Sequence, residues 1–212
     1  MLFMSACSPT APDMVYIAPS SRYSTAGFWI DKYEAKINGS SASSASGVDP
    51  QVNVNYAAAK AACEAASKRI CTFREWKAAC RGPKDRFVAF QDTYNSPLAV
   101  IDVCDVDRTT NNTPGSLPSK TGSHAQCKTE GIELYDMIGN LSEWTFDNDR
   151  SVPVSAGVAF YQAASNSSCD TKLSNTPGSL ADVDPANEST DIGFRCCADQ
   201  PPGAGSPPSF PF

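Results

Sequence analysis

The chain has 212 residues, of which 41% are hydrophobic and 19% are charged, and its formal net charge is −6. This length and hydrophobic content are sufficient for one domain with a buried core and short tails. The composition is typical of a globular, loop-rich protein and argues against a helical bundle or a disordered chain. The acidic balance argues against nucleic acid as a partner, because phosphate binding needs a basic face. No apolar run is long enough to span a membrane.

The chain holds nine cysteines, more than a cytosolic protein of this size normally carries unless they bind metal. A zinc site needs close cysteine pairs of the C-x-x-C kind, and none is present. The single histidine, His124, further weakens a metal cluster. We therefore expect disulfides formed in an oxidising compartment, which places the protein outside the cytoplasm as a secreted or bacterial cell-envelope protein.

The ninth cysteine has two interpretations. Cys7 follows Met4-Ser5-Ala6, and small residues before a cysteine are typical of a bacterial lipoprotein cleavage site. The apolar segment before it is shorter than the apolar region of a signal peptide, which has roughly 7–15 residues. Either Cys7 carries a lipid anchor and the true start lies upstream, or the resemblance is chance. In the first case eight cysteines remain for bridges.

Three regions are predicted along the chain. Residues 1–13 form a truncated lipoprotein signal and tether, residues 14–199 form the folded domain, and residues 200–212 form a disordered Pro/Gly-rich tail. Within the domain, the Ser/Ala-rich segment Ser40–Gly47 is predicted to be a surface loop. Short strands are predicted from apolar runs at Met14–Ile17, Gly27–Ile30, Val158–Tyr161 and Ile192–Cys197.

Two helices are predicted. The Ala-dense segment Asn55–Ser67 has a helical repeat of small apolar residues: Ala59, Ala62, Cys63 and Ala66. The second helix begins at the T-x-x-E capping box of Thr72 and Glu75 and continues through Cys80. The Arg81-Gly82-Pro83 sequence ends it.

Several motifs in series carry a family resemblance. The longest is Leu134–Trp144 (LYDMIGNLSEW), which resembles G-L-Y-D-M-x-G-N-V-W-E-W. The others are Phe28–Glu34 (FWIDKYE), Lys68–Trp76 (KRICTFREW), Asn175–Pro177 (NTP) and Gly193–Cys196 (GFRC). In this order they resemble the formylglycine-generating-enzyme, or sulfatase-modifying-factor, family, although Ala35-Lys36-Ile37-Asn38 departs from its V-T-N. The resemblance implies an α+β fold: a single compact, loop-rich domain of the C-type-lectin-like kind, stapled by disulfides.

The resemblance also implies two disulfides, Cys63–Cys196 and Cys80–Cys169. Elimination leaves two further pairs. Cys104 and Cys127 flank the Asn/Thr/Pro-rich loop and would close it, and Cys71 would join Cys197. Spacing alone does not determine connectivity, because eight cysteines allow 105 arrangements.

The catalytic residues of the family are missing. The resemblance implies two cysteines five residues apart, which bind copper(I) and oxidise a substrate cysteine to formylglycine. Counted back from Cys169, these positions are Ala159 and Ala164, and the segment Gly157–Ser168 holds no cysteine. Methyl groups cannot bind copper, so copper is not expected and the domain is predicted to be catalytically inactive.

The alternative is an oxidoreductase of the formylglycine-generating type, or another enzyme that uses the same groove. A hydrolase would need His124 as its base, but no nucleophile motif lies nearby in the sequence. Acid–base work could fall to the carboxylate pairs Asp105/Asp107 and Asp147/Asp149, for which solvated turns or ion ligands are the other interpretation. A redox-active free cysteine pair would favour an enzyme, and fully paired cysteines would favour a binding module.

By resemblance, a structural calcium ion is expected at four residues: Asp136, Gly139, Leu141 and Glu143. Two carboxylates with backbone carbonyls provide suitable oxygen ligands. The other interpretation is that Asp136 and Glu143 cap and hydrogen-bond a tight turn. Similarly, Trp29, Trp76 and Trp144 could be ligand-stacking platforms, although core packing is the expected role of the last two.

The sequence therefore predicts an extracytoplasmic surface protein that serves as a binding or structural module for a ligand or protein that is not identified. Its variable face would comprise three loops: Ser40–Gly47, Val106–Gly122 and Ala159–Ser168. The step to binding is an analogy at the level of the fold, in which loops on a rigid scaffold carry function.

Overall fold

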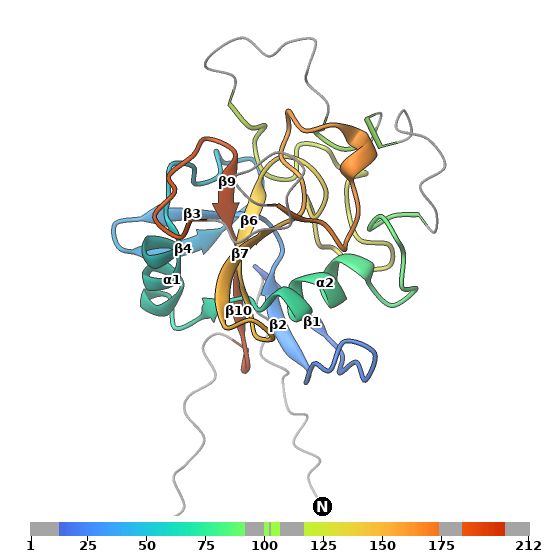
Figure 1. The fold of residues 1–212 in the computed structure, drawn as a ribbon, viewed down its shortest axis with the longest axis horizontal. Coiled ribbons are helices and arrows are strands. Elements are labelled where there is room, and N and C mark those ends of the chain that lie inside the picture. Colours follow the sequence, from blue (N-terminus) through green and yellow to red (C-terminus); the bar gives the residue numbers. More distant parts are fainter. Residues whose placement is uncertain (1–12, 92–99, 102, 107–116, 174–183, 202–212) are drawn as a thin grey trace, which may run out of the picture.

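A computed structural model describes residues 13–91, 100–101, 103–106, 117–173 and 184–201 (Figure 1). It contains one sheet of strand order β1-β2-β10-β5, a second of order β8-β7-β6-β9, and a separate hairpin of β3 and β4. The strands are β1 Met14–Ile17, β2 Phe28–Asp31, β3 Ala35–Asn38, β4 Ser41–Ser44, β5 Arg69–Ile70, β6 Ser142–Asp147, β7 Val152–Ala156, β8 Lys172–Leu173, β9 Ile192–Phe194 and β10 Cys196–Ala198. The predicted α+β, loop-rich fold is confirmed.

The first sheet joins the two ends of the described chain. Met14 pairs with Asp31 and Ile17 with Phe28 in the antiparallel β1–β2 pair. On its other side, β2 pairs with β10, where Cys197 lies opposite Ile30. Successive side chains of a strand point to opposite faces. At β10 both faces of the sheet are buried, because Cys196 and Cys197 are each 0% exposed.

Helix α1 (Tyr56–Ala65) begins at Asn55, whose side chain accepts a hydrogen bond from the Ala58 N–H at 2.9 Å. Such a cap satisfies one of the backbone N–H groups that have no partner within the helix. The predicted small-residue face is buried, with Ala59 and Cys63 both 0% exposed. The helix packs against β4 and β5.

Helix α2 (Phe73–Arg81) has the predicted capping box: the Thr72 hydroxyl accepts from the Glu75 N–H, and the Glu75 carboxylate accepts from the Thr72 N–H. Reciprocal bonds of this kind fix the first turn. The helix extends one residue beyond the prediction, to Arg81, and ends at Gly82, whose φ is +62°. Its apolar face packs toward β6 and β7.

The core has two main clusters of buried side chains. The larger surrounds α2 and includes Phe28, Trp76, Leu134 and Met137. The smaller surrounds Trp144 and lies beneath α1. The Trp76 indole N–H donates to the Glu143 carboxylate, and the Trp144 indole N–H donates to the Val54 carbonyl, each at 2.8 Å. Trp76 and Trp144 are therefore core residues and not exposed stacking platforms.

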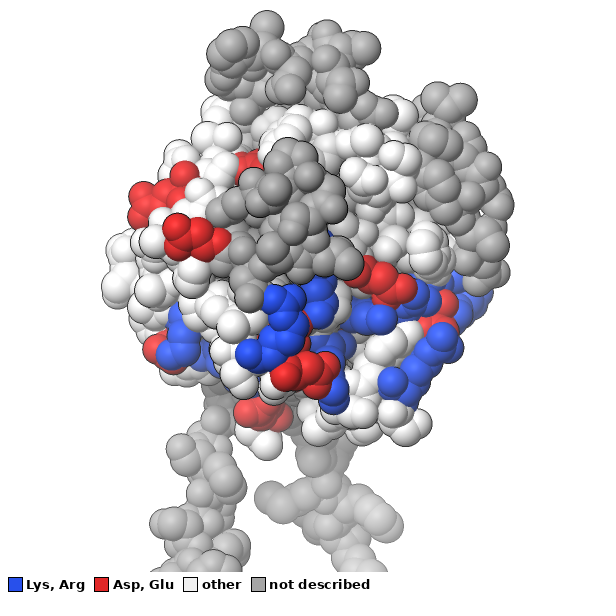
Figure 2. Space-filling model, in the orientation of Figure 1, with Lys and Arg blue, Asp and Glu red and all other residues white. Residues whose placement is uncertain are grey.

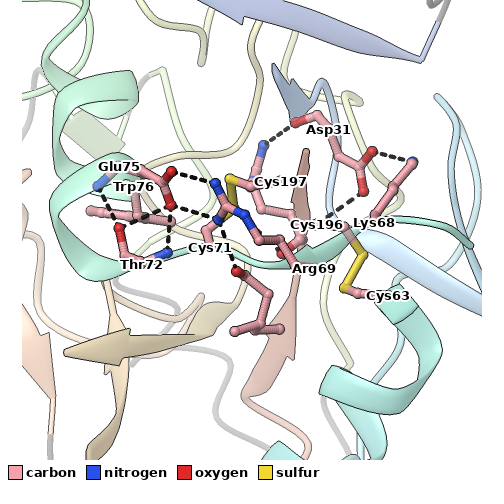
Figure 3. Close-up of a disulfide and its surroundings, with 12 residues drawn as sticks. Asp31, Cys63, Lys68, Arg69, Cys71, Thr72, Glu75, Trp76, Cys196 and Cys197 are labelled. Atoms are coloured by element: carbon pink, nitrogen blue, oxygen red, sulfur yellow. Dashed lines mark hydrogen bonds and ion pairs between the residues drawn. A yellow bond between two sulfur atoms is a disulfide. The ribbon is translucent and has the colours of Figure 1, made fainter. Parts of the chain in front are cut away.

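Four disulfides hold this fold together: Cys63–Cys196, Cys71–Cys197, Cys80–Cys169 and Cys104–Cys127. These are the pairs that the resemblance and elimination indicated. The adjacent Cys196 and Cys197 belong to different clusters, because consecutive side chains of β10 point to opposite faces. One strand thus ties α1 on one side and the segment before α2 on the other, as Figure 3 shows.

The same region holds two ion pairs (Figure 3). Asp31 is fully buried, pairs with Lys68 at 2.5 Å and accepts the Cys196 N–H at 3.0 Å. Burial raises the pKa of Asp31, while Lys68 opposes the shift. Arg69 pairs with Glu75, which anchors β5 to the first turn of α2.

Three predictions about local structure are wrong. Val158–Tyr161 is not a strand; the strand is β7, which ends at Ala156 before Gly157 at φ +78°. Val158, Ala159 and Phe160 are buried even though they pair with none of the described strands, because this irregular segment packs into the core. Ser40–Gly47 is not wholly a loop, because Ser41–Ser44 pairs with β3 across a turn that contains Gly39 at φ +63°.

The third concerns Ile192–Cys197, which was predicted as one strand. The structure divides it at Arg195 into β9 and β10, which belong to different sheets. The buried side chain of Arg195 bonds to Glu143 at this break. None of the helices in the described part of the chain has the length and apolar character of a membrane span.

Candidate functional site

The groove positions that the resemblance assigned to catalysis lie inside the core. Ala159 and Ala164 are both 0% exposed, and their neighbours Val158 and Phe160 are buried. Ala164 belongs to the larger hydrophobic cluster, and neither methyl group reaches solvent. That these two positions carry no catalytic chemistry stays a prediction.

Local hydrogen bonds explain why the segment turns inward here. The Ala159 N–H donates to the Gln162 side chain at 2.6 Å, and the Phe160 N–H donates to the Asn140 carbonyl at 2.9 Å. A short 3-10 helix, η2 (Ala164–Asn166), follows and leads to Cys169. Its disulfide with Cys80 fixes the end of the segment on α2.

No thiol is left for copper in the described part of the chain, because all eight of its cysteines are in disulfides. Among these residues, moreover, no group of three or more Cys, His, Asp or Glu side chains could hold a metal ion. Cys7, the predicted lipidation site, lies outside the described residues.

Beneath this segment is a buried ion pair of Glu143 and Arg195, each 1% exposed at its side chain. The Glu143 carboxylate accepts from Arg195 Nε at 2.7 Å, from the terminal nitrogen at 2.6 Å and from the Trp76 indole at 2.8 Å. Arg195 also donates to the backbone carbonyls of Asp31 and Tyr135. Buried ions need such complete bonding, because desolvation is costly.

Two further buried carboxyl groups lie beside this pair. Glu34 accepts from the Leu141 N–H at 2.9 Å and from the Asn140 side chain. Burial raises the pKa of Glu34 well above its usual value, and the charges of Asp136 and Glu143 add to the shift. Burial likewise raises the pKa of Asp136 to about 6, although Asp136 accepts the Gly122 N–H at 2.6 Å. Protonation thus relieves the excess of negative charge around one arginine.

The predicted calcium ligands Asp136, Gly139, Leu141 and Glu143 do not fit the ion in this arrangement. Both oxygens of Glu143 are bonded to Arg195, and a dication beside that guanidinium would be repelled. The Asp136 carboxylate is directed at the Gly122 N–H instead. Calcium stays a prediction, and it would require these side chains to rearrange.

Asn140 connects the predicted loops. Its backbone N–H donates to the Asp105 carbonyl at 2.8 Å, its side chain donates to the Ser119 carbonyl at 3.2 Å, and its carbonyl accepts from Phe160. Its φ of +57° is a conformation that asparagine adopts more readily than most residues. The segments around residues 105, 119 and 160 therefore meet at one turn of the G-N motif.

The first predicted loop joins this cluster through Thr121. The Gly47 N–H donates to the Thr121 carbonyl at 2.8 Å, and the Thr121 hydroxyl donates to the Ala45 carbonyl at 2.6 Å. Ala45, Ser46 and Gly47 are exposed. The described parts of the three predicted loops thus form one assembly, which we call the loop cluster (residues 45–48, 117–122 and 159–168).

The other candidate residues have structural partners. Asp147 is buried and pairs with Lys172 at 2.6 Å, and Asp149 pairs with Arg74. Asp105 is buried and its carboxylate accepts from the Ser119 N–H at 3.2 Å, while Asp107 lies outside the described residues. His124 is half-buried in a turn, where its carbonyl accepts from the Cys127 N–H.

Sequence reasoning did not assign roles to Glu34, Asn140 or Arg195, although each lies in a recognised motif. Glu34 ends FWIDKYE, Asn140 is the asparagine of the G-N turn and Arg195 is the arginine of GFRC. In GFRC, a charged residue among apolar neighbours was the available signal for a buried ion pair. The choice of Glu143 as the partner of Arg195 follows from the register of β6 and β9, in which Glu143 lies opposite Gly193.

Comparison with known proteins agrees with this fold. A curated relative, the inactive C-alpha-formylglycine-generating enzyme 2 of Bos taurus, is 28% identical over 181 residues, which is 75% of this chain and 52% of the relative. The chain thus spans about half the length of that relative.

Two solved structures show the same fold. PvdO from Pseudomonas aeruginosa has a TM-score of 0.59 at 14% identity, over 82% of this chain and 80% of that one. Variable protein 1 of Treponema denticola has a TM-score of 0.61 at 18% identity, over 82% and 85%. The family model of the sulfatase-modifying factor enzyme 1-like domain matches residues 34–200, which include α1, α2, both groove alanines and all four disulfides. The chain therefore belongs to the family of sulfatase-modifying factor enzyme 1-like domains.

Proposed function

We propose that this protein is a catalytically inactive sulfatase-modifying-factor domain that acts outside the cytoplasm as a binding or structural module. The observation that carries the proposal is the complete burial of Ala159 and Ala164 as methyl groups in the core. A copper(I) oxidase needs soft thiolate ligands at an open position, whereas these two positions hold alanines that are closed off from solvent. The name of the bovine relative, an inactive formylglycine-generating enzyme, supports the same conclusion.

The disulfides support a location outside the cytoplasm. Four bridges in one small domain are typical of proteins that mature in an oxidising compartment. They also suit a module whose loops must be held in place without extensive regular structure, since each bridge restricts the unfolded chain.

The loop cluster is the surface that we assign to binding. Its exposed members include Ala45–Gly47, Ala163 and the pair Ser165–Asn166. They are small or polar, so they leave the backbone accessible. Thr121 joins two of the loops within the cluster, and Asn140 fixes it from below. A rigid base of this kind lowers the entropic cost of binding.

The test is a direct assay of oxidation. The oxidised full-length protein is incubated with copper(I), oxygen and a set of cysteine-containing peptides, and each peptide is weighed by mass spectrometry beside an active family member. We expect no conversion of any peptide thiol to an aldehyde. Conversion by the unaltered protein, at a rate that depends on copper, would show that the proposal is wrong.

Copper binding is measured separately by competition with a copper(I) chelator. The unaltered protein should not compete. The variant A159C/A164C restores two thiols in the groove, and the variant A163C/S165C places two thiols at exposed positions of the same segment as its control. Competition by the first variant alone would show that the groove keeps the shape of a metal site and lacks only the ligands.

A further inference from the structure

A second surface of the molecule lies between β1 and α2 and uses none of the residues of the loop cluster. It is a pocket of about 390 Å³. Its walls are largely aromatic or aliphatic, and the principal lining residues are Tyr16, Ile17, Pro19, Tyr23, Pro83 and Ile132. A concave, mostly apolar site with a few polar groups is the usual form of a binding pocket, and this volume lies within its normal range.

One wall depends on a glycine. Tyr16 is 52% exposed, and the tip of its ring lies over Gly27, where an added Cβ would lie 2.0 Å from the hydroxyl oxygen. The ring also contacts Trp29, with centroids 5.6 Å apart. A half-exposed aromatic side chain held over a glycine at the mouth of an apolar pocket is suited to contact a ligand.

Three cations form a rim at or beside the pocket, although the protein as a whole is acidic. Arg22 lines the pocket, as does its partner Asp85, while Lys77 lies beside Tyr23 and Arg81 beside Asp85. Arg22 pairs with Asp85, Lys77 pairs with Asp170, and Arg81 contacts both of these carboxylates. Three cations therefore share two carboxylates. Among the described residues, the buried Nε of Arg81 has no hydrogen-bond acceptor. Figure 2 shows Lys and Arg side chains gathered over the region of α2.

These cations surround one of the lining rings. The Arg22 guanidinium lies 5.8 Å and the Lys77 ammonium 5.6 Å from the centroid of Tyr23, whose hydroxyl donates to Asp85. The Arg22 side chain is 67% exposed, so its charge is available to a ligand at the rim. An anionic group beside the pocket would be attracted here.

The pocket also adjoins a sheet edge. Among the described strands, β1 has β2 as its one neighbour, and Tyr16 and Ile17 belong to β1. The outer edge of such a strand presents N–H and C=O groups that an extended peptide can pair with. Side chains of that peptide would then lie at the pocket.

From these three features we propose that the surface binds an extended acidic peptide, with one aromatic side chain in the pocket and neighbouring carboxylates at the cationic rim. Backbone pairing with β1 supplies the orientation, the ring fills the apolar volume, and the carboxylates meet Arg22 and Lys77. The proposal does not depend on the inactive status of the domain. A protein that bound this peptide and also oxidised cysteine would uphold it while contradicting the proposed function.

The test uses the full-length protein and the peptide Asp-Glu-Phe-Glu-Asp-NH2 with a fluorescent dye attached to its N-terminus, and binding is measured by anisotropy. Two further peptides are compared: one with Ala in place of Phe, and one with Gln in place of each acidic residue. We expect each change to weaken binding by about tenfold or more, because the site needs both the ring and the charges. Equal affinity for the Ala peptide would reduce the surface to a nonspecific basic patch and overturn the proposal.

Two variants examine the site itself. R22E reverses a charge at the rim, and its control is R74E, another exposed arginine of this region with one aspartate partner and no place in the pocket. G27A displaces the Tyr16 ring, and the backbone at Gly27 does not need a positive φ. R22E and G27A should each lose about tenfold in affinity, while R74E should stay within about twofold. Unchanged binding by either test variant, with an unchanged thermal midpoint, would overturn the proposal.

Discussion

Arg195 and Glu143 form a fully buried ion pair, with the guanidinium Nε 2.7 Å from one carboxylate oxygen and a terminal nitrogen 2.6 Å from the other. Arg195 comes from the break between β9 and β10, and Glu143 comes from β6, so the pair joins the two four-stranded sheets. Replacing one partner leaves a buried charge without its counter-charge, whereas replacing both leaves no unpaired buried charge.

We therefore expect Glu143→Gln to lower the free energy of unfolding by about 3–5 kcal/mol. Gln keeps an acceptor for the Trp76 indole, so the change isolates the charge. The double variant E143Q/R195M should lose less than the sum of the two single variants. Urea unfolding measures all three, and additive losses would show that the two residues do not act as a pair.

Asp136 should make stability depend on pH. Its folded-state pKa is about 6, above the ordinary 3.8, so the folded protein binds more protons than the unfolded chain between these values. The stabilisation is complete below the unfolded pKa and is lost as the pH rises through the folded pKa, about 2–3 kcal/mol in all. The raised pKa of Glu34 acts in the same direction.

The measurement is the difference between the unaltered protein and Asp136→Asn, which removes the acidic group and keeps a residue tolerant of the φ of +58°. Several surface carboxylates with lowered pKa values, such as Asp170, oppose the trend and cancel in this difference. A pH-independent difference between the two proteins from pH 4 to pH 7 would contradict the assigned shift.

Calcium should not stabilise the protein. A bound ion at about 100 times its Kd would add about 2.7 kcal/mol, which a thermal scan detects readily. Because Arg195 occupies the Glu143 carboxylate, we expect the same midpoint in EDTA and in calcium chloride. A rise in the midpoint that Asp136→Asn abolishes would show that the calcium prediction from the family resemblance is right and that these side chains rearrange.

The disulfides should differ in their contribution. The Cys63–Cys196 bridge spans 133 residues and the Cys104–Cys127 bridge spans 23. On the loop-entropy model the longer bridge contributes about 1.5 kcal/mol more. Paired Cys→Ala variants, unfolded in urea, test this order, and a peptide map without reductant tests the pairs. A larger loss on removing the shorter bridge would exclude loop entropy as the main cause.

The local signals in the sequence predicted some elements well. The capping box at Thr72 and the alanine face of α1 depend on residues close in the chain, so the ends of α2 are predicted to within one residue and those of α1 to within two. The small polar strand β4 lacks such a signal, because its apolar content is low and its pairing with β3 depends on the turn. Short strands such as β5 and β8 exist only through their partners.

At the candidate site, the sequence showed that alanines stand where the family resemblance implies cysteines, but it did not predict that these alanines are buried. A count of residues suffices to place Ala159 and Ala164 in the chain, whereas their burial is a property of the tertiary fold, in which the Phe160 N–H donates to the Asn140 carbonyl. The calcium set shows the same limit. The carboxylate of Glu143 was visible in its motif, but its occupation by an arginine more than fifty residues later is a property of the tertiary fold.

The two neighbouring cysteines of β10, Cys196 and Cys197, also constrain the order of synthesis and disulfide formation. Cys63 and Cys71 both wait for partners that are among the last residues of the domain to be synthesised. Cys80–Cys169 and Cys104–Cys127 need no residue of β10 and can form earlier. Until β10 is made, however, Cys63 and Cys71 have no native partner, so correct maturation requires that these two thiols stay reduced until the end of the domain has emerged.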